Sequence, residues 1–550
     1  MSGDNQHVQV ARVTRRRLIL LGSAGVAAMY GLRDMPTSIA QAAPGPRTAS
    51  DGILKMGLSN EPPNLDPHQT SAAISSEVMA DCFDTLVVGL ENQQIVPSLA
   101  TAWSRSKDGK EITFHLRTGV TFHDGTPFNA LAMKQSFDRM VDPATKSGLA
   151  ASLLGPYKGS RTIDDHTLTM AFSTPFAPLL QNLTQLFTAP VSPAAIKRYG
   201  LGLATHPIGT GPFAFKEWVK QDHISFVRNP NYRWAPAFFG RNGPPALQGI
   251  TWKPVAEDAT RIATLQDGES NIIESFPPTF LQQFKSDNTY VVDVKMRTGL
   301  PFSLMVNTQK APCNDLRVRQ ALEYGIDKNS ISRVLTFGLN PPAHGPLSPV
   351  TFGYWPGAET MYPYNPTKAK ALLDQAGWIV GSDGIRQKGG QRLHMEFWTL
   401  SDIVEWQNIA EAFQAEMKVI GIDIKIVSQA RAAWGAGVMA GKHHLTVQIF
   451  TLPDPSVLSI NFHSKNIGGQ GFNWSRYANP TLDHLLDEGD VTFDLATRKK
   501  VYQQAQQIIM DNAVVIPVFI NEQAFGRLAT IEGITYVEGG QPLFYATHIA

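Results

Sequence analysis

The chain has 550 residues, of which 43% are hydrophobic and 17% charged, so it can build several hydrophobic cores and is not a largely disordered protein. Its 48 Lys and Arg balance 47 Asp and Glu, which excludes the strong basic field that would hold nucleic acid or an anionic membrane. The two cysteines, Cys82 and Cys313, exclude a disulfide scaffold and a cysteine-rich metal cluster. An oxidising compartment would permit them to pair, but we expect two unpaired thiols that are either buried or without a role.

The first 42 residues have the pattern of an export signal. Arg15 and Arg16 precede a mild apolar stretch, residues 18–32, which is shorter than the roughly 20 residues that a membrane-spanning helix needs. A charged start, a short apolar middle and a small-residue exit are typical of a signal peptide, with cleavage here near Ala42 and Ala43. The paired arginines favour the twin-arginine pathway, with a plain Sec signal or a retained anchor as alternatives. We therefore expect a periplasmic protein.

The remaining chain alternates between strand-like and helix-like segments. Period-two patterns rich in β-formers predict strands over 112–116, 223–227, 290–294 and 422–427. Apolar residues at helical spacing predict helices over 316–324, 366–376, 405–420 and 495–509. Gly377 and Gly421 are suited to end two of these helices, and Asp315 is suited to cap the first. This alternation indicates mixed α/β domains.

Several short motifs follow one another along the whole mature chain. They are Leu65-Asp66-Pro67, the block 96–139 with its turn Asp124-Gly125-Thr126-Pro127, Gly209-Thr210-Gly211-Pro212-Phe213, Arg228-Asn229-Pro230-Asn231-Tyr232, the stretch from Asn307 through 315–322 to 326–328, and 364–385. In this order they resemble the family 5 extracytoplasmic solute-binding proteins of ABC importers, which include oligopeptide-, dipeptide- and nickel-binding members.

The resemblance implies an α/β fold of the large periplasmic-binding-protein type, with two lobes joined by a two-segment hinge around the ligand. The implied boundaries are 43–82, 190–298 and 516–550 for lobe I, 83–189 for a subdomain inserted in lobe I, and 299–515 for lobe II. We interpret Gly209-Thr210-Gly211-Pro212 as a tight linker where the chain crosses between lobes. The resemblance also implies a monomer, without a cofactor, that docks transiently on an ABC permease with its ATPase subunits.

The ligand-anchoring position departs from the pattern of the peptide-binding relatives. Those proteins hold a free amino group with an acid four residues before a proline in the second lobe. Here the position four before Pro455 is Thr451, so an ammonium would lose a charge-assisted hydrogen bond there. Asp454 could replace the missing acid, although an Asp between two prolines also suits a turn.

Further candidate ligand contacts come from aromatic and polar residues. Binding pockets combine aromatic area with a few polar groups, and these candidates could equally be core or surface packing. The candidates are Trp398, Trp434, Phe472, Trp474, Ser71 and Asn307.

Neither metal binding nor catalysis has a motif in this sequence. His443 and His444 adjoin Lys442 and are expected to face solvent, and no histidine pair has the spacing of a zinc site. A nucleophile elbow and a Walker A loop are both absent from the sequence. We therefore expect a binding protein that is not an enzyme and takes peptides or a related small organic solute. The alternatives are a receptor for a non-peptide solute or metal chelate, a sensor-type binder, and a secreted hydrolase.

Overall fold

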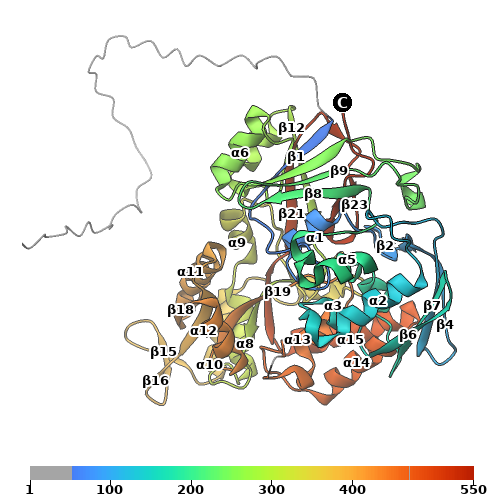
Figure 1. The fold of residues 1–550 in the computed structure, drawn as a ribbon. Coiled ribbons are helices and arrows are strands. Elements are labelled where there is room, and N and C mark those ends of the chain that lie inside the picture. The colour runs from blue at the N-terminus through green and yellow to red at the C-terminus, as the bar shows by residue number, and fades with distance from the viewer. Residues whose placement is uncertain (1–51, 470) are drawn as a thin grey trace, which may run out of the picture. The chain divides into compact units, whose positions relative to one another are not determined.

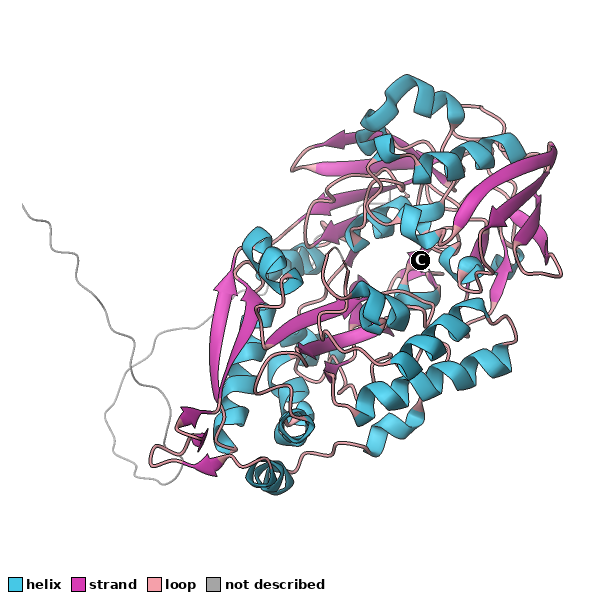
Figure 2. Ribbon diagram, turned by 90° about the horizontal axis from the view of Figure 1, so that it is seen from below, coloured by secondary structure: helices cyan, strands magenta, loops and turns pink. Residues whose placement is uncertain are grey.

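The computed structural model describes residues 52–469 and 471–550 (Figure 1). The export signal with Arg15 and Arg16 lies outside the described residues, so its interpretation stays a prediction. Three large sheets organise the described chain: one of seven strands, one of five and one of four. Figure 2 shows that helices and strands are interspersed throughout, as expected for a mixed α/β protein.

The seven-stranded sheet forms the first lobe and lies at the top of Figure 1. Its order is β12-β21-β11-β1-β10-β9-β8, from β1 (Ile53–Leu58), β8 (Phe213–Val219), β9 (His223–Arg228), β10 (Gly249–Pro254), β11 (Ile272–Ile273), β12 (Tyr290–Met296) and β21 (Glu522–Leu528). The helices of this lobe are α1 (Ala73–Met79), α5 (Pro193–Tyr199), α6 (Asp258–Asp267) and α7 (Leu281–Lys285). Helix α6 packs on β1, β11 and β21 and so covers one face of the sheet near its centre.

The four-stranded sheet forms a subdomain between α1 and α5 in the sequence. Its order is β4-β5-β7-β6, from β4 (Ala100–Arg105), β5 (Glu111–Leu116), β6 (Tyr157–Asp164) and β7 (Thr167–Phe172). Ile112, Phe114 and Leu116 alternate into the core of this subdomain, which explains the period-two pattern of β5. Helix α2 (Ala130–Val141) packs on β6 and β7, and Asn129 caps it by accepting from the N–H of Ala132. The shorter elements here are β2 (Val87–Gly89), β3 (Ile95–Pro97), α3 (Ala150–Leu153) and α4 (Leu179–Asn182).

The five-stranded sheet forms the second lobe. Its order is β18-β17-β19-β13-β20, from β13 (Leu300–Val306), β17 (His394–Leu400), β18 (Asp423–Gln429), β19 (Leu445–Phe450) and β20 (Val515–Phe519). The helices are α8 (Leu316–Gly325), α9 (Lys328–Leu335), α10 (Pro366–Gln375), α11 (Val404–Val419), α12 (Arg431–Met439), α13 (Val457–Phe462), α14 (Pro480–Val491) and α15 (Leu495–Asp511). Every residue of β13 is buried because this strand lies between β19 and β20 and is covered on both faces.

Small antiparallel pieces complete the chain. A three-stranded sheet of β14 (Ile379–Val380), β15 (Arg386–Lys388) and β16 (Gln391–Arg392) projects from the second lobe at the lower left of Figure 1. The C-terminal segment adds the pairs β22 (Ile531–Glu532) with β25 (His548–Ile549) and β23 (Thr535–Tyr536) with β24 (Pro542–Leu543). Within the described ranges, none of the helices combines the length and apolarity needed to cross a bilayer.

The chain crosses between the seven- and five-stranded sheets at two adjacent points. Residues 297–299 connect β12 to β13, and residues 520–521 connect β20 to β21. The N–H of Arg297 donates to the carbonyl of Asn521 at 2.9 Å, so the two connections lie side by side. The lobe boundary implied at 516 falls inside β20.

The interpretation of Gly209-Thr210-Gly211-Pro212 as an inter-lobe linker is wrong. This segment stays in the first lobe and packs on the turn after α1, where the N–H of Gly211 donates to the carbonyl of Cys82 at 2.9 Å. A Cβ atom on Gly209 would lie 2.2 Å from the same carbonyl oxygen. Glycine is required here because two stretches of backbone are in direct contact.

Candidate ligand-binding site

A cavity of about 780 Å³ lies between residues of the two lobes. The first lobe and its subdomain line it with residues 71–77, 148–152, 184–187 and 537–541. The second lobe lines it with residues 449–453 at the C-terminal end of β19, with Ile460 of α13, and with the loop that contains Asn466 and Phe472. The cavity therefore brings together segments that are far apart in the sequence, as the ligand sites of two-lobed proteins do.

The wall from the second lobe is neutral. Phe450 and Phe472 meet edge to face with ring centroids 5.3 Å apart and supply its aromatic area. Thr451 and Asn466 provide polar side chains, and Pro453 completes this wall. Among the described residues that line the cavity, none from this lobe carries a charge. The missing acid at Thr451 is thus not replaced by another acid of the same wall.

The charged groups of the cavity come from the first lobe and the hinge. Glu77, on α1, is only 2% exposed, and its Oε1 lies 3.4 Å from Nη2 of Arg297. Gln523, on β21, donates to the same carboxyl oxygen, while Oε2 of Glu77 has no hydrogen-bond partner. Burial raises the pKa of Glu77 to about 7, and the charge of Glu274 adds to this, against the opposing effects of Arg297 and Gln523.

A second carboxyl group, Glu538, lies in the loop between β23 and β24. Its side chain accepts a hydrogen bond from the amide of Gln181, and its Oε1 is buried without a partner. Burial raises the pKa of Glu538 to about 8, the charge of Asp454 raises it further, and the bond from Gln181 opposes both. No ion pair joins Glu538 to a cation within the described residues.

Three of the predicted ligand contacts line the cavity. Ser71 belongs to the wall of the first lobe, and Thr451 and Phe472 belong to the wall of the second. Their contact with a ligand stays a prediction, supported by this placement.

Asp454 and Asn307 are instead engaged inside the second lobe. Asp454 forms a two-pronged ion pair with Arg498 at 2.8 and 2.7 Å, and both side chains are buried. Asn307 is buried, and its amide donates to the carbonyls of Gly441 and His443, each at 3.0 Å. Both side chains have strong structural partners, and neither lines the cavity.

The three predicted tryptophans pack behind the cavity wall. Trp434 meets Trp474 at a centroid distance of 5.2 Å, and Trp474 in turn contacts Phe472 at 6.0 Å. Trp398 is buried on β17, where its indole N–H donates to Glu396 at 3.2 Å. None of the three lines the cavity, and of the three only Trp474 has a ring contact with Phe472.

The expectation that His443 and His444 face solvent is wrong. Both rings are buried beside β19 and contact backbone carbonyls, His443 that of Trp474 at 2.9 Å and His444 that of Ala311 at 3.1 Å. Burial lowers the pKa of each to about 4, so both rings are neutral. Within residues 52–469 and 471–550, no group of three or more potential ligand side chains could hold a metal ion.

Sequence reasoning missed Glu77, Arg297, Gln523 and Glu538. Arg297 lies in the first crossing and Gln523 follows the second at the start of β21, while Glu538 lies in a loop with no hydrophobic periodicity. Glu77 did carry a signal, because an acid on a mostly apolar helix next to Val78 and Met79 is costly unless it has a role.

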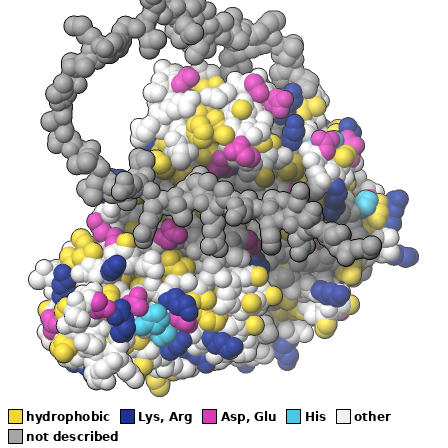
Figure 3. All heavy atoms as spheres, turned by 90° about the vertical axis from the view of Figure 1, so that its left-hand side faces the viewer, with side chains coloured by type: hydrophobic (Ala, Val, Ile, Leu, Met, Phe, Trp, Pro, Cys, Tyr) yellow, Lys and Arg dark blue, Asp and Glu magenta, His cyan; other side chains and the backbone are white. Residues whose placement is uncertain are grey.

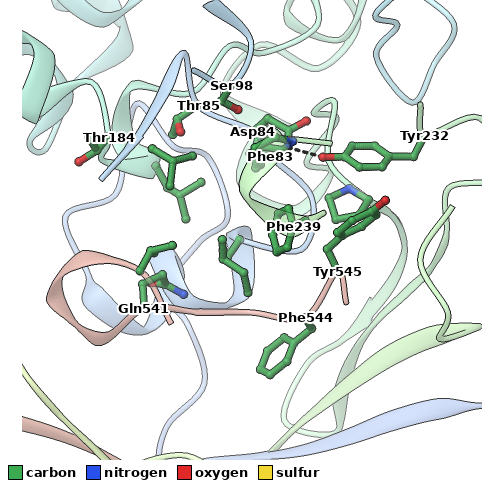
Figure 4. Close-up of a pocket in the computed structure, with 17 residues that line it drawn as sticks. Phe83, Asp84, Thr85, Ser98, Thr184, Tyr232, Phe239, Gln541, Phe544 and Tyr545 are labelled. Atoms are coloured by element: carbon green, nitrogen blue, oxygen red, sulfur yellow. Dashed lines mark hydrogen bonds between the residues drawn. The ribbon is translucent and has the colours of Figure 1, made fainter. Parts of the chain in front are cut away.

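A smaller cavity of about 70 Å³ in the first lobe belongs to the core (Figure 4). Asp84 lies at its edge and accepts hydrogen bonds from Thr210 at 2.9 Å and from Tyr232 and Trp234 at 3.1 Å each. Burial raises the pKa of Asp84 to about 6, against the effect of these donors. Figure 4 shows Phe239, Phe544 and Tyr545 around the cavity. Both oxygens of Asp84 have hydrogen-bond donors, and the cavity is too small for an organic solute.

The two cysteines, Cys82 and Cys313, are unpaired and buried.

Comparison with known proteins identifies a family and several proteins of similar sequence. Residues 94–469 match the family model "Bacterial extracellular solute-binding proteins, family 5 Middle". The glutathione-binding protein GsiB of Pectobacterium atrosepticum is 28% identical over 474 residues, covering 84% of this chain and 87% of the relative. GsiB of Escherichia coli O157:H7 is 28% identical over 495 residues, covering 88% of this chain and 92% of the relative.

Solved structures show the same fold. The periplasmic binding protein DppA of Helicobacter pylori, in complex with the peptide STSA, superimposes with a TM-score of 0.75 at 26% identity and covers 90% of this chain and 98% of its own. HbpA2 of Haemophilus parasuis gives a TM-score of 0.78 at 25% identity, covering 90% of this chain and 100% of its own. NikA of Brucella suis, in complex with Fe(III)-EDTA, gives 0.79 at 24% identity with the same two coverages, which bears on the fold alone. With its two α/β lobes, the cavity between them and a family match over most of its length, the chain belongs to the family 5 bacterial extracellular solute-binding proteins.

Proposed function

We propose that this protein is the periplasmic receptor of an ABC importer and captures a peptide or a related small organic solute between its two lobes. The observation that carries the proposal is the cavity of about 780 Å³ whose walls come from both lobes. That volume is in the range of sites that enclose a small organic molecule. The family membership supports the same function.

Capture follows from the adjacent crossings at 297–299 and 520–521. Two neighbouring connections permit the lobes to rotate as rigid bodies, because only a few backbone torsions need to change. A ligand that contacts both walls stabilises the closed arrangement, and its binding energy sets how far the population shifts. The permease then recognises the closed form, while its ATPase subunits supply the energy of transport. The receptor itself makes and breaks no covalent bond.

The lining of the cavity suits a ligand with both polar and apolar parts. Phe450 and Phe472 offer aromatic area, and Thr451, Asn466 and Ser71 offer hydrogen bonds. Arg297 is the one cationic side chain among the described lining residues and suits a carboxylate. Peptides have all of these features, and the names of the relatives make glutathione and other short peptides the first to test.

Export and domain organisation belong to the same proposal. Residues 1–42 act as a twin-arginine signal that is removed near Ala43, and the mature receptor works in the periplasm as a monomer. Lobe I takes residues 43–82, 190–298 and the C-terminal return, with the subdomain at 83–189 inserted into it, and lobe II begins at 299. Figure 3 shows Lys and Arg interspersed with Asp and Glu on the visible part of one face. A permease that docks on this face would meet charges of both signs.

The test is native mass spectrometry of the purified mature protein, followed by release and identification of any retained ligand. A co-purifying peptide or mixture of peptides is expected, and titration calorimetry with the same peptides should give a saturable binding curve. A single non-peptide solute or a metal chelate would contradict the peptide assignment while leaving the receptor function intact. Turnover of a chromogenic ester or peptide would contradict the receptor function itself.

A further inference from the structure

The charges around the inter-lobe cavity are unequal. Its described lining residues include two acids, Glu77 and Glu538, and one base, Arg297. The wall from the second lobe is neutral, so the whole imbalance comes from the first lobe and the hinge. When both acids are ionised, the lining carries one more negative than positive charge and favours a ligand of the opposite charge.

The two acids differ in the side chains that contact their carboxyl groups. Glu77 already has a cation of the protein, Arg297, and the amide of Gln523 against its Oε1. Glu538 receives only the neutral amide of Gln181, and its Oε1 is buried without a partner. Ionising a buried carboxyl group without a cation beside it is costly, and a ligand that brings a cation lowers that cost.

The other charged groups near Glu538 are engaged elsewhere. Asp454, which acts on Glu538 from the second lobe, is bound on both oxygens by Arg498. Lys295 of β12, which packs on the loop of Glu538, pairs with Glu91 at 2.7 Å and lies over the ring of Tyr536. Neither neighbour supplies a free cation to Glu538.

From this arrangement we infer that the ligand carries an ammonium or guanidinium group and that Glu538, rather than Asp454 or Thr451, receives it. The inference rests on the proposed function, since it assumes a ligand between the lobes. It places the charge-recognising acid on the first lobe, opposite the neutral wall of Phe450, Thr451 and Phe472. The cationic end of the ligand would then lie beside Gln181, and its other parts would reach the second lobe and stabilise closure.

The experiment uses the mature protein and a tryptic digest of casein as a defined peptide source. Wild type and the variants Glu538→Gln, Glu538→Asp and Glu532→Gln are each incubated with the digest, separated from unbound peptide, and analysed by native mass spectrometry. The most strongly retained peptide that contains neither Arg nor His is then synthesised with its amines free and with its amines acetylated, so that acetylation removes every cation, and both forms are titrated calorimetrically. Glu532 is the matched control because it is an exposed acid in the same C-terminal segment.

We expect Glu538→Gln to weaken binding of the free-amine peptide by at least tenfold, equivalent to about 1.4 kcal/mol. Glu538→Asp should retain part of the affinity, Glu532→Gln should bind like wild type, and acetylation should abolish the difference between wild type and Glu538→Gln. Glutamine can still accept the bond from Gln181, so the variant should fold, which circular dichroism checks.

Two results would overturn the inference alone: equal affinity of wild type and Glu538→Gln for the free-amine peptide, or tight binding of the acetylated form to wild type. If wild type retains no peptide at all, the peptide assignment fails and the inference falls with it. These outcomes separate failure of the specific acid from failure of the proposed function.

Discussion

The buried ion pair between Asp454 and Arg498 makes a sharp prediction about the second lobe. The two side chains are 3% and 5% exposed and share two hydrogen bonds of 2.7 and 2.8 Å. Burial alone would lower the pKa of Arg498, but the charge and hydrogen bonds of Asp454, together with Tyr502 and Asp490, more than offset this and raise it. Asp454→Asn keeps the shape of the side chain and leaves the guanidinium buried without a counter-charge.

The expected loss follows from that uncompensated charge. Removing one partner of a buried pair costs about 3–5 kcal/mol. For a unit of the second lobe's size, each kcal/mol lowers the melting temperature by about 2–4 °C, so the second-lobe transition should fall by roughly 6–20 °C. Thermal unfolding followed by circular dichroism and tryptophan fluorescence measures this shift. Replacing Arg498 with Met in the Asp454→Asn background should restore part of it, because the unpaired charge is then gone.

The control is Asp383→Asn, which removes one partner of the exposed Asp383–Arg392 pair and should barely change the melting temperature. At a temperature where Asp454→Asn is folded, its affinity for the retained peptide should equal that of wild type. A melting temperature within about 2 °C of wild type would refute the structural role of the pair, since the reasoning requires at least 3 kcal/mol. A tenfold weaker affinity of the folded variant would instead return Asp454 to the ligand site.

Three further predictions concern the cavity, the thiols and export. Because burial raises the pKa of Glu538 to about 8, the free protein holds it neutral at low pH, and affinity for a cationic peptide should rise by up to about tenfold per pH unit between about pH 6 and about pH 7.5. Glu77, whose pKa is about 7, titrates in the same pH range. The contribution of Glu538 is therefore the decrease in the slope of affinity against pH that Glu538→Gln causes. If the variant has the same slope as wild type, Glu538 does not bind the cation. Burial raises the pKa of both cysteine thiols to about 12, so iodoacetamide at about pH 8 should label them only after denaturation, and rapid labelling of the native protein would show that they are accessible. Replacing Arg15 and Arg16 with Lys should keep the precursor in the cytoplasm of a host with a functional twin-arginine pathway, whereas normal export on cell fractionation would indicate a Sec signal.

Much of the secondary structure could be read from local patterns. The strands expected at 112–116, 223–227, 290–294 and 422–427 are present as β5, β9, β12 and β18. The helices expected at 316–324, 366–376, 405–420 and 495–509 are present as α8, α10, α11 and α15. Asp315 caps α8 by accepting from the N–H of Arg317 at 2.9 Å. These features depend on residues within a few positions of one another, which is the range over which periodicity and capping act.

The site depended on contacts that no local pattern reveals. Asp454 looked available because the sequence does not show that Arg498, far along the chain on α15, is folded against it. The sequence suggested that His443 is exposed because Lys442 precedes it. Its ring is nevertheless buried, because the backbone carbonyl of Trp474 gives it a hydrogen-bond partner. Glu538 is brought to the cavity by the return of the chain to the first lobe, and only that tertiary arrangement makes its carboxyl group a candidate anchor.

The place of β21 in the seven-stranded sheet also constrains how the protein can be made. This strand comes from residues 522–528, close to the C-terminus, yet it lies between β12 and β11 rather than at an edge. A nascent chain cannot close the first lobe until translation has passed this segment and the ribosome has released it. Should export require a folded cargo, the precursor has to wait in the cytoplasm for its last few dozen residues. A premature stop before residue 522 would then leave two unpaired strand edges in the middle of a sheet, an aggregation-prone product rather than a shortened receptor.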